Sequence, residues 1–220
     1  MSIAFSRSSP SPRYRELLAQ YTRMHTHGEQ FSNIPAQQTF AGQSLPRHAG
    51  VIESLVAAHG ANSILDYGSG KGEQYKPMQV NAGEGKKFPS IPAFWGVDLV
   101  TCYDPGYAPF SQLPQGKFDG VISTDVLEHC PEDDVLWIVE EMFSFARKFV
   151  YANVACYPAQ KRLSTGENAH CTVRPMEWWS DVLKSVAPRH PGVYYRFALD
   201  RHLKTPGGVR VITDLLAGIG

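Results

Sequence analysis

Short apolar segments alternate with amphipathic ones along most of this chain, and that alternation limits the fold more than any other feature. The clearest helical pattern lies at 132–147, where Val135, Ile138, Val139 and Met142 share one face. Strands that alternate with helices imply a mostly parallel sheet with crossover helices on both faces. Strands are expected at 63–67, 96–103, 118–123 and 149–156, and further helices near 14–21, 47–59 and 175–187.

The last two strands are expected at 193–199 and 209–215, with a Pro206-Gly207-Gly208 turn before the second. No helix separates them, so this final pair should be antiparallel. Residues 1–13 are rich in Ser and Pro and indicate an extended arm. A helix is expected to start after Gly72, with a long loop through 73–95. We therefore divide the chain into an N-terminal arm and cap segment, 1–46, and one α/β domain, 47–220.

Charge and composition exclude several classes of protein. The 220 residues suit one domain, and 21 basic residues balance 21 acidic ones. A whole-molecule basic field for nucleic acid is therefore not indicated. No apolar run is long enough to cross a membrane and no export signal is evident, which predicts a cytoplasmic protein. None of the four cysteines forms a C-x-x-C pair, so we expect reduced, mostly buried thiols at Cys102, Cys130, Cys156 and Cys171.

A glycine-rich turn, Gly68-Ser69-Gly70-Lys71-Gly72, directly follows the strand at 63–67. Glycines let the backbone approach a ligand, and ligands of parallel sheets bind at the carboxyl ends of strands. The turn is no P-loop, because Leu65 and Gly72 stand where Gly and Ser or Thr are needed. Glu73 likewise departs from the dinucleotide fingerprint. A purely structural turn remains an alternative.

An acidic residue ends the next strand, where a carboxylate can accept both hydroxyls of a ribose. Asp104 is our choice for this role, because Val100–Tyr103 resembles the strand and Pro105-Gly106 its turn. Asp98 is the rival. A carboxylate that caps a turn is the structural alternative for either residue.

Two segments together resemble a known family. Residues 63–72, Ser-Ile-Leu-Asp-Tyr-Gly-Ser-Gly-Lys-Gly, resemble the first motif of class I S-adenosylmethionine-dependent methyltransferases. Residues 118–129, Phe-Asp-Gly-Val-Ile-Ser-Thr-Asp-Val-Leu-Glu-His, resemble their fourth-strand motif, and His170 with 174–179 resembles the segment that opens their last helix. The resemblance covers roughly 63–215. It implies a Rossmann-like three-layer αβα sandwich with S-adenosyl-L-methionine as cofactor.

The resemblance also assigns residues to the cofactor. It places the methionine part and the ribose against the first motif, at Asp66, Tyr67, Gly68, Ser69 and Gly70, and the ribose hydroxyls on Asp104. The residues after the fourth strand, Thr124, Asp125 and Val126, would line the cofactor and face the acceptor. One departure concerns the thirteen residues 105–117, where the family places a helix and another strand. This leaves the adenine pocket as a guess at Phe110, Ser111 and Leu113.

Proton transfer from an acceptor would need a base, and Asp125, Glu128, His129 and His170 are the candidates. The Leu-Glu-His stretch could instead only position the following helix. The same set could hold Mg, Mn or Zn, as in similar methyltransferases that act on catechol-like or RNA ribose oxygens. Here the first ligand is Asp rather than Glu, so no metal is assigned from the sequence. Arg174 is a possible acceptor contact, while His25 and His27 are expected at the surface.

These observations predict methyl transfer from S-adenosylmethionine to an acceptor that is a small molecule, a sugar or a nucleotide. One alternative is an enzyme that transfers another part of the same cofactor. A second is a non-catalytic binding subunit that keeps the fold. A nucleotide-sugar or dinucleotide enzyme is disfavoured by Glu73. The acceptor atom and the oligomeric state have no signal in the sequence.

Overall fold

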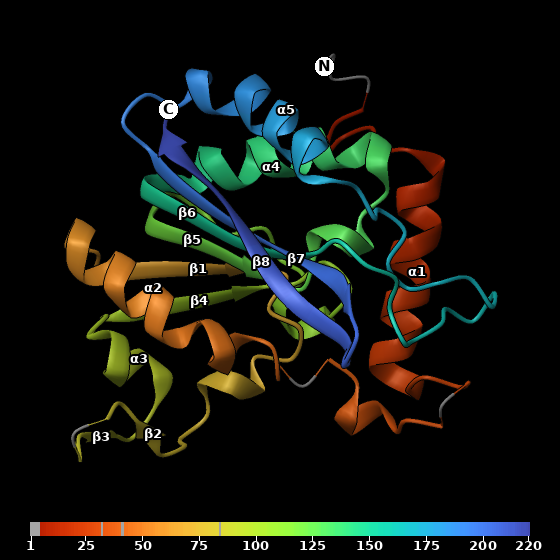
Figure 1. The fold of residues 1–220 in the computed structure, drawn as a ribbon, viewed down its shortest axis with the longest axis horizontal. Coiled ribbons are helices and arrows are strands. Elements are labelled where there is room, and N and C mark those ends of the chain that lie inside the picture. Colours follow the sequence, from red (N-terminus) through yellow and green to blue (C-terminus); the bar gives the residue numbers. More distant parts are fainter. Residues whose placement is uncertain (1–4, 32, 41, 84) are drawn as a thin grey trace.

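The computed structural model describes residues 5–31, 33–40, 42–83 and 85–220. Its centre is a six-stranded sheet of order β4-β1-β5-β6-β7-β8 (Figure 1). Neighbours from β4 to β7 run parallel, and β7 and β8 run antiparallel. The strands are β1 (Ser63–Tyr67), β4 (Leu99–Tyr103), β5 (Phe118–Thr124), β6 (Ala146–Ala155), β7 (Tyr194–Thr205) and β8 (Gly208–Ile219). The predicted Rossmann-like sandwich with an antiparallel final pair is confirmed.

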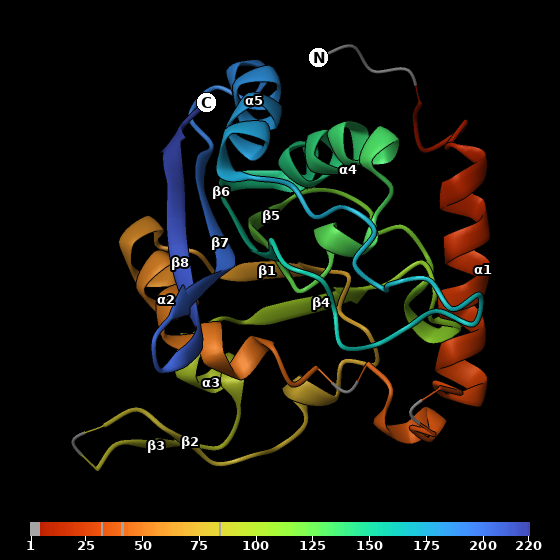
Figure 2. The ribbon, with the colours of Figure 1, turned by 45° about the vertical axis from the view of Figure 1, so that its right-hand side comes forward.

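Helices cover both faces of this sheet. Helices α4 and α5 pack on one face and α2 and α3 on the other, while α1 stands beyond the carboxyl ends of β1 and β4 (Figures 1 and 2). The helix bounds are α1 (Pro12–His27), α2 (Leu45–His59), α3 (Ile91–Trp95), α4 (Glu132–Phe145) and α5 (Met176–Val186). None of the helices in the described ranges has the length and apolar character that a membrane span requires.

The start of α1 is attached to the start of α4. The Ser11 hydroxyl accepts the Tyr14 amide at 3.0 Å and so caps α1, whose first residue is Pro12. The buried Asp134 in the first turn of α4 accepts the Ser11 amide at 3.0 Å and also the Ser11 hydroxyl. This buried junction holds α1 across the end of the sheet, where a ligand of a parallel sheet would bind.

The extended arm packs against the domain over its described part, from residue 5 onward. Residues 1–4 lie outside the described ranges. Arg7 forms an ion pair with Glu141 of α4 and donates to the Tyr67 hydroxyl at 2.9 Å. Its guanidinium carbon also lies 5.5 Å from the ring centre of Tyr103 and 5.4 Å from that of Trp137. The arm is held in place because Arg7, which belongs to no periodic segment, meets a half-buried carboxylate.

Two expectations for 73–95 were wrong. Gly72 leads only into a 3₁₀ turn, Glu73–Tyr75, and the rest contains a small hairpin, β2 (Val80–Asn81) with β3 (Lys87–Phe88), and the helix α3. The helix after Gly72 does not form because Gln74 and Tyr75 turn inward to bond Asp66. The signals for α3 are ordinary ones: Ser90 accepts the Ala93 amide, and Gly96 ends the helix at φ +69°.

The shortening after β4 is confirmed. Residues 105–117 contain one 3₁₀ turn, Ala108–Phe110, and then enter β5, so β4 is an edge strand beside β1. At the other edge, β7 and β8 are each twelve residues long, well beyond the predicted strand ends. The cysteines are free, but three are only half-buried and Cys171 is exposed, which corrects the expectation of buried thiols.

Candidate functional site

The carboxyl ends of β1, β4 and β5 meet beside α1, and the candidate residues gather there in two groups. The first is the glycine loop, 68–72, with Asp104 from the end of β4. The second follows β5 and comprises Asp125, His129 and His170, called the triad below. Parallel neighbours place these ends at one edge of the sheet, where the sequence motifs predicted them.

Each glycine of the loop adopts a left-handed conformation, with φ +86° at Gly68, +59° at Gly70 and +67° at Gly72. A Cβ atom would lie 2.5 Å from Val126 at Gly68 and 2.7 Å from the Phe40 carbonyl at Gly70. The backbone turn and the chain's own packing therefore require these glycines. Their presence alone is no sign of a ligand, and the structural alternative accounts for it.

Asp104 is bound to the glycine loop. Its Oδ2 accepts the Gly70 amide at 2.9 Å and its Oδ1 accepts the Gly106 amide at 2.8 Å. Burial raises the pKa of Asp104 to about 6, although these amides favour the charged form. Each carboxylate oxygen retains a further lone pair for a donor such as a ribose hydroxyl. The rival Asp98 is exposed and has no such position.

His25 covers Asp104 and is buried, contrary to the expectation of a surface histidine. Its ring stacks on Tyr107, with ring centres 5.0 Å apart, and packs on Phe40 at 4.7 Å. Burial, with Lys71 nearby, lowers the pKa of His25 to about 4, so the ring is neutral at pH 7. Its Nδ1 is buried without a partner among the described residues. A buried nitrogen of this kind is free to bond a ligand.

The remaining residues of the first motif have different surroundings. Asp66 is buried and accepts the Tyr75 hydroxyl at 2.8 Å and the Gln74 amide at 3.1 Å, and burial raises its pKa to about 6. The Tyr67 side chain points toward α4 and donates to Glu141 at 2.7 Å, so only its backbone borders the loop. The Ser69 hydroxyl is buried with no oxygen or nitrogen partner in the described part of the chain.

Backbone carbonyls fix both histidines of the triad. Nδ1 of His129 lies 2.9 Å from the Ala169 carbonyl, and Nδ1 of His170 lies 2.6 Å from the Tyr157 carbonyl. A carbonyl can only accept, so each Nδ1 carries the proton and each Nε2 presents a lone pair. The Tyr21 hydroxyl of α1 also donates to the Ala169 carbonyl at 3.1 Å. Burial, with His170 beside it, lowers the pKa of His129 to about 4.

The pKa values of the two acidic residues after β5 are shifted in opposite directions. Asp125 has φ +62° and accepts the Ser44 hydroxyl at 2.9 Å. Burial favours its neutral form, but His129, Glu128 and Ser44 together hold the pKa of Asp125 below its ordinary value. Glu128 is fully buried and its Oε1 accepts the Ala155 amide at 2.7 Å. Burial and the Asp125 charge raise the pKa of Glu128 well above its ordinary value, which favours its neutral form.

The triad offers one carboxylate oxygen and two imidazole nitrogens that lie within 4.8 Å of one another. Two histidines and one carboxylate, with both rings oriented by carbonyls, are a common ligand set for a divalent metal. Glu128 lies outside this set because its side chain turns inward to β6. Of the four residues proposed as bases, the structure thus brings three together and places the fourth behind them.

The other predicted positions contribute less. Thr124 ends β5, and Val126 packs its side chain on Gly68. Phe110 packs on the Gly72 side of the loop, while Ser111 and Leu113 are exposed. Arg174 pairs with Glu132 at the start of α4 and is exposed. These contacts neither build an adenine pocket nor assign Arg174 to an acceptor.

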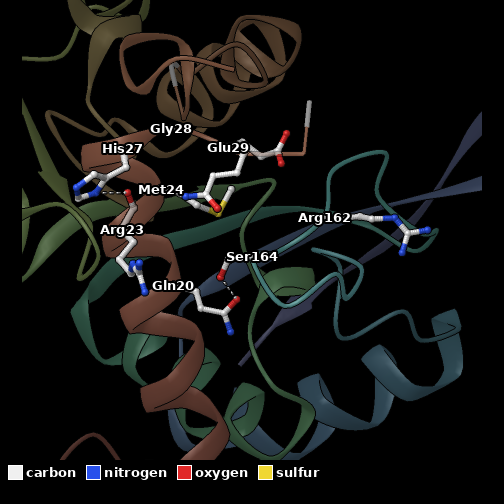
Figure 3. A pocket seen from close by; sticks show the side chains of 9 residues that line it. Gln20, Arg23, Met24, His27, Gly28, Glu29, Arg162 and Ser164 are labelled. Carbon is white, nitrogen blue, oxygen red and sulfur yellow. Dashed lines mark hydrogen bonds between the residues drawn. The ribbon is translucent and has the colours of Figure 1, made fainter. Parts of the chain in front are cut away.

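Two cavities open elsewhere on the surface. One of about 70 Å³ lies between α1 and the segment at 162–164, where Ser164 donates to Gln20 at 3.2 Å (Figure 3). The other, of about 460 Å³, lies between the start of α5 and the strands β7 and β8 and includes Cys156 and Arg201. Neither is lined by the glycine loop or the triad.

The N-terminal segment, interpreted from the sequence as an arm and cap, contributes side chains beside the site. The lining includes Tyr21 and His25 of α1, Phe40, and Ser44 just before α2. Phe40 closes over the loop, since its carbonyl accepts the Lys71 amide at 3.3 Å. The helical stripe at 14–21 indicated the helix that carries Tyr21, but no motif or period in the sequence indicated that Ser44 bonds Asp125.

Comparisons with known proteins give several structural likenesses. No protein-family model matches the chain, and no curated protein matches it. Magnesium protoporphyrin IX methyltransferase (ChlM) from Synechocystis PCC 6803, solved with bound SAH, matches at 14% identity over 89% of this chain and 92% of that chain, with a TM-score of 0.46. A DhpI–SAH complex matches at 14% identity over 95% of this chain and 82% of that chain, with a TM-score of 0.28. Both scores are low, and the assignment below depends on this chain's own residues.

Proposed function

We propose that this protein is a cytoplasmic methyltransferase that uses S-adenosyl-L-methionine and acts on a small-molecule, sugar or nucleotide acceptor. The observation that supports it best is the bond between Asp104 and the Gly70 amide. It joins an acidic strand end to a glycine loop at the carboxyl edge of the sheet, which is where a ribose and its neighbouring groups are held in such folds. The triad adjoins this position after β5.

The residues present fit the cofactor at several points. Asp104 would accept the ribose hydroxyls, and the buried Nδ1 of His25 and hydroxyl of Ser69 offer polar groups that lack nitrogen or oxygen partners among the described residues. Phe40 and Val126 pack closely on the loop, so the segment around Phe40 would have to shift as the cofactor enters. When bound, S-adenosylmethionine supplies an activated methyl group, which leaves orientation as the main task of the protein.

The chain's own groups would orient the acceptor and manage its proton. His129 is neutral at pH 7 because its pKa is about 4, so its Nε2 lone pair is available to a hydroxyl of the acceptor. Asp125 is ionised and offers a second acceptor for that hydroxyl. Glu128, buried behind it, accepts the Ala155 amide at 2.7 Å and helps to hold the pKa of Asp125 below its ordinary value.

We further propose that the triad can hold a divalent metal ion; when it does, the His129 Nε2 lone pair binds the metal instead of the acceptor hydroxyl. Its ligand atoms converge, and the low pKa of His129 means that protons do not compete for Nε2 near pH 7. Asp125, His129 and His170 would be the ligands. A cation there would polarise an acceptor hydroxyl and make its proton easier to remove.

Calorimetric titration with S-adenosylhomocysteine tests the cofactor assignment. The wild type should bind, and Asp104→Asn should weaken binding by about tenfold to a hundredfold, as the loss of hydrogen bonds to a charged group predicts. The matched control is Asp98→Asn, because Asp98 is exposed and lies at the other end of β4 from Asp104. This variant should bind S-adenosylhomocysteine as the wild type does. Absence of binding by the wild type would overturn the assignment.

Titration with Co²⁺, followed by its visible absorption, tests the metal. The wild type should develop a coordination spectrum that His170→Gln and Asp125→Asn each abolish. His202→Gln is the control, because His202 stacks on Tyr157 next to the triad but contributes no ligand atom. A spectrum that persists in His170→Gln would show that the metal binds elsewhere.

A second candidate function is a non-catalytic subunit that keeps the fold. The packing of Phe40 on Gly70 and of Val126 on Gly68 favours it, because the chain itself fills the space that glycines leave. Such a subunit would not bind S-adenosylhomocysteine in the titration above. Transfer of another part of the cofactor is separated from methyl transfer by methyl-labelled S-adenosylmethionine, since only methyl transfer labels the acceptor.

A further inference from the structure

Strand β8 forms one edge of the sheet over its whole length. It pairs with β7 through twelve consecutive residue pairs, from Gly208 opposite Thr205 to Ile219 opposite Tyr194. Within the described residues no strand pairs with its other side. A long regular edge presents a row of free amide and carbonyl groups that can pair with another strand.

The usual protections of such an edge are missing from β8. Its ladder has no register shift and its sequence has no proline. Most odd-numbered side chains are apolar, with Thr213 as the polar one, and the large apolar ones are exposed: Val209 at 59%, Val211 at 54%, Leu215 at 51% and Ile219 at 71%. Natural edge strands generally avoid this combination, so the edge is suited to a partner.

The charges of β8 indicate which partner. Its only ionisable residues are Arg210 and Asp214, both on the even-numbered face. If a second β8 pairs antiparallel about a two-fold axis through Ile212, Arg210 of each copy lies opposite Asp214 of the other. The same register places Val209 opposite Leu215, so apolar side chains continue across the junction. A strand that complements itself in charge and in hydrophobicity fits a symmetric interface.

Asp214 has the capacity for this contact. Within its own chain it bonds Arg201 of β7 through Oδ2. Only Oδ2 bonds that arginine, so Oδ1 is available to a second guanidinium. Arg210 is exposed and has no ion pair among the described residues.

We propose that two copies of this chain associate through β8, antiparallel and centred on Ile212, so that their sheets become continuous. The inference goes beyond the proposed enzymatic function and does not depend on it. The triad lies after β5, at the carboxyl end of another strand, so a dimer of this kind leaves it uncovered by the junction.

Cross-linking tests the register. In antiparallel pairs, directly opposite Cα atoms are about 4.5–5.5 Å apart, within the range that a disulfide spans. Ile212→Cys should therefore form a covalent dimer on mild oxidation. Thr213→Cys is the matched control: it lies one residue from the axis, opposite Val211 of the second copy, and should not cross-link. Equal cross-linking of both variants would contradict the proposed register.

Sedimentation equilibrium tests the association itself. The wild type should be dimeric at tens of micromolar, and Arg210→Asp should raise the dissociation constant by about tenfold or more, because like charges then lie opposite each other. Lys204→Asp makes the same charge change on exposed β7 and should leave the constant unchanged. Circular dichroism checks that each variant is folded. A monomeric wild type, or equal effects of the two variants, would overturn the proposal.

Discussion

The Oδ2 atom of Asp104 accepts the backbone amide of Gly70 at 2.9 Å, so the acid at the end of β4 is held against the loop at the end of β1. The pKa of this carboxyl is about 6 because the group is buried. A protonated carboxyl cannot accept two ribose hydroxyls as a carboxylate does. The affinity for S-adenosylhomocysteine should therefore be constant from pH 7 to 8 and fall below about pH 6. Calorimetry across this range measures the change of affinity with pH, and Asp104→Asn should remove that change. If the affinity of Asp104→Asn still falls below pH 6, another group causes the pH dependence.

The second prediction concerns stability and Asp66. Its folded pKa of about 6 lies above the ordinary value, so the folded state binds the proton more tightly than the unfolded state. This contribution to stability is present at low pH and is lost as pH rises through about 6. The free energy of unfolding of Asp66→Asn, relative to that of the wild type, should therefore rise by about 1–3 kcal/mol from pH 4 to pH 8. Urea unfolding at both pH values measures the change.

Asp119 provides the control of opposite sign. Its pKa is lowered, because the Asn62 amide and nearby Lys148 outweigh its burial. Its contribution to stability is present at neutral pH and is lost as pH falls. Asp119→Asn should thus lose stability relative to the wild type as pH rises, and equal trends in the two variants would contradict both assignments.

The third prediction separates backbone strain from packing in the glycine loop. Gly68→Ala combines a left-handed φ of +86° with a Cβ placed 2.5 Å from Val126. We expect a loss of about 2–4 kcal/mol in the free energy of unfolding. Gly83→Ala is the matched control, because Gly83 has φ +81° but nothing within 4 Å, so only the cost of the backbone applies.

Val126→Ala completes the test by removing the methyl groups that the new Cβ would meet. In the Gly68→Ala background it should recover part of the loss, while the backbone cost remains. A double-mutant cycle with a coupling energy near zero would show that Val126 does not limit the loop.

The fourth prediction concerns Arg7, which joins the N-terminal segment to Glu141 and Tyr67. Arg7→Met should cost about 2–4 kcal/mol, because it leaves a half-buried carboxylate without its cation. Arg13→Met is the control: Arg13 pairs with Glu16 and Glu167 in exposed positions and should cost less than about 1 kcal/mol. Denaturant unfolding of both variants measures the two losses. Equal losses of unfolding free energy would contradict a larger contribution from the ion pair between Arg7 and Glu141.

The sequence predicted those parts of the fold that depend on periodicity and strand-end motifs. Helix α4 and strands β1 and β5 follow from apolar patterns that local packing preserves, and Gly68 and Asp104 follow from their places after strands. Asp125, Glu128, His129 and His170 were named as a possible ligand set, and the structure brings all but Glu128 together; spacing alone could not show that the loop from 157 to 170 returns to the end of β5.

The failures have a common cause in long-range contacts. His25 looked like a surface histidine because its helix pattern carries no information about Phe40 and Tyr107, which bury it from other segments. The helix expected after Gly72 does not form, because the Gln74 side chain turns inward and donates to Asp66. Bonds formed between distant or inward-turned residues cannot be found from local composition.

The two imidazoles of the triad are both tied to carbonyls of one short stretch, Tyr157 to Ala169. An insertion or deletion inside it would rotate both rings at once, whereas single substitutions leave the two carbonyls where they are. Most of the stretch is exposed and contains no helix or named strand, so it looks tolerant of change. Its constraint is on spacing rather than on side-chain identity. Among relatives it would be recorded as a constant length of the segment 157–169, with free variation at its exposed positions.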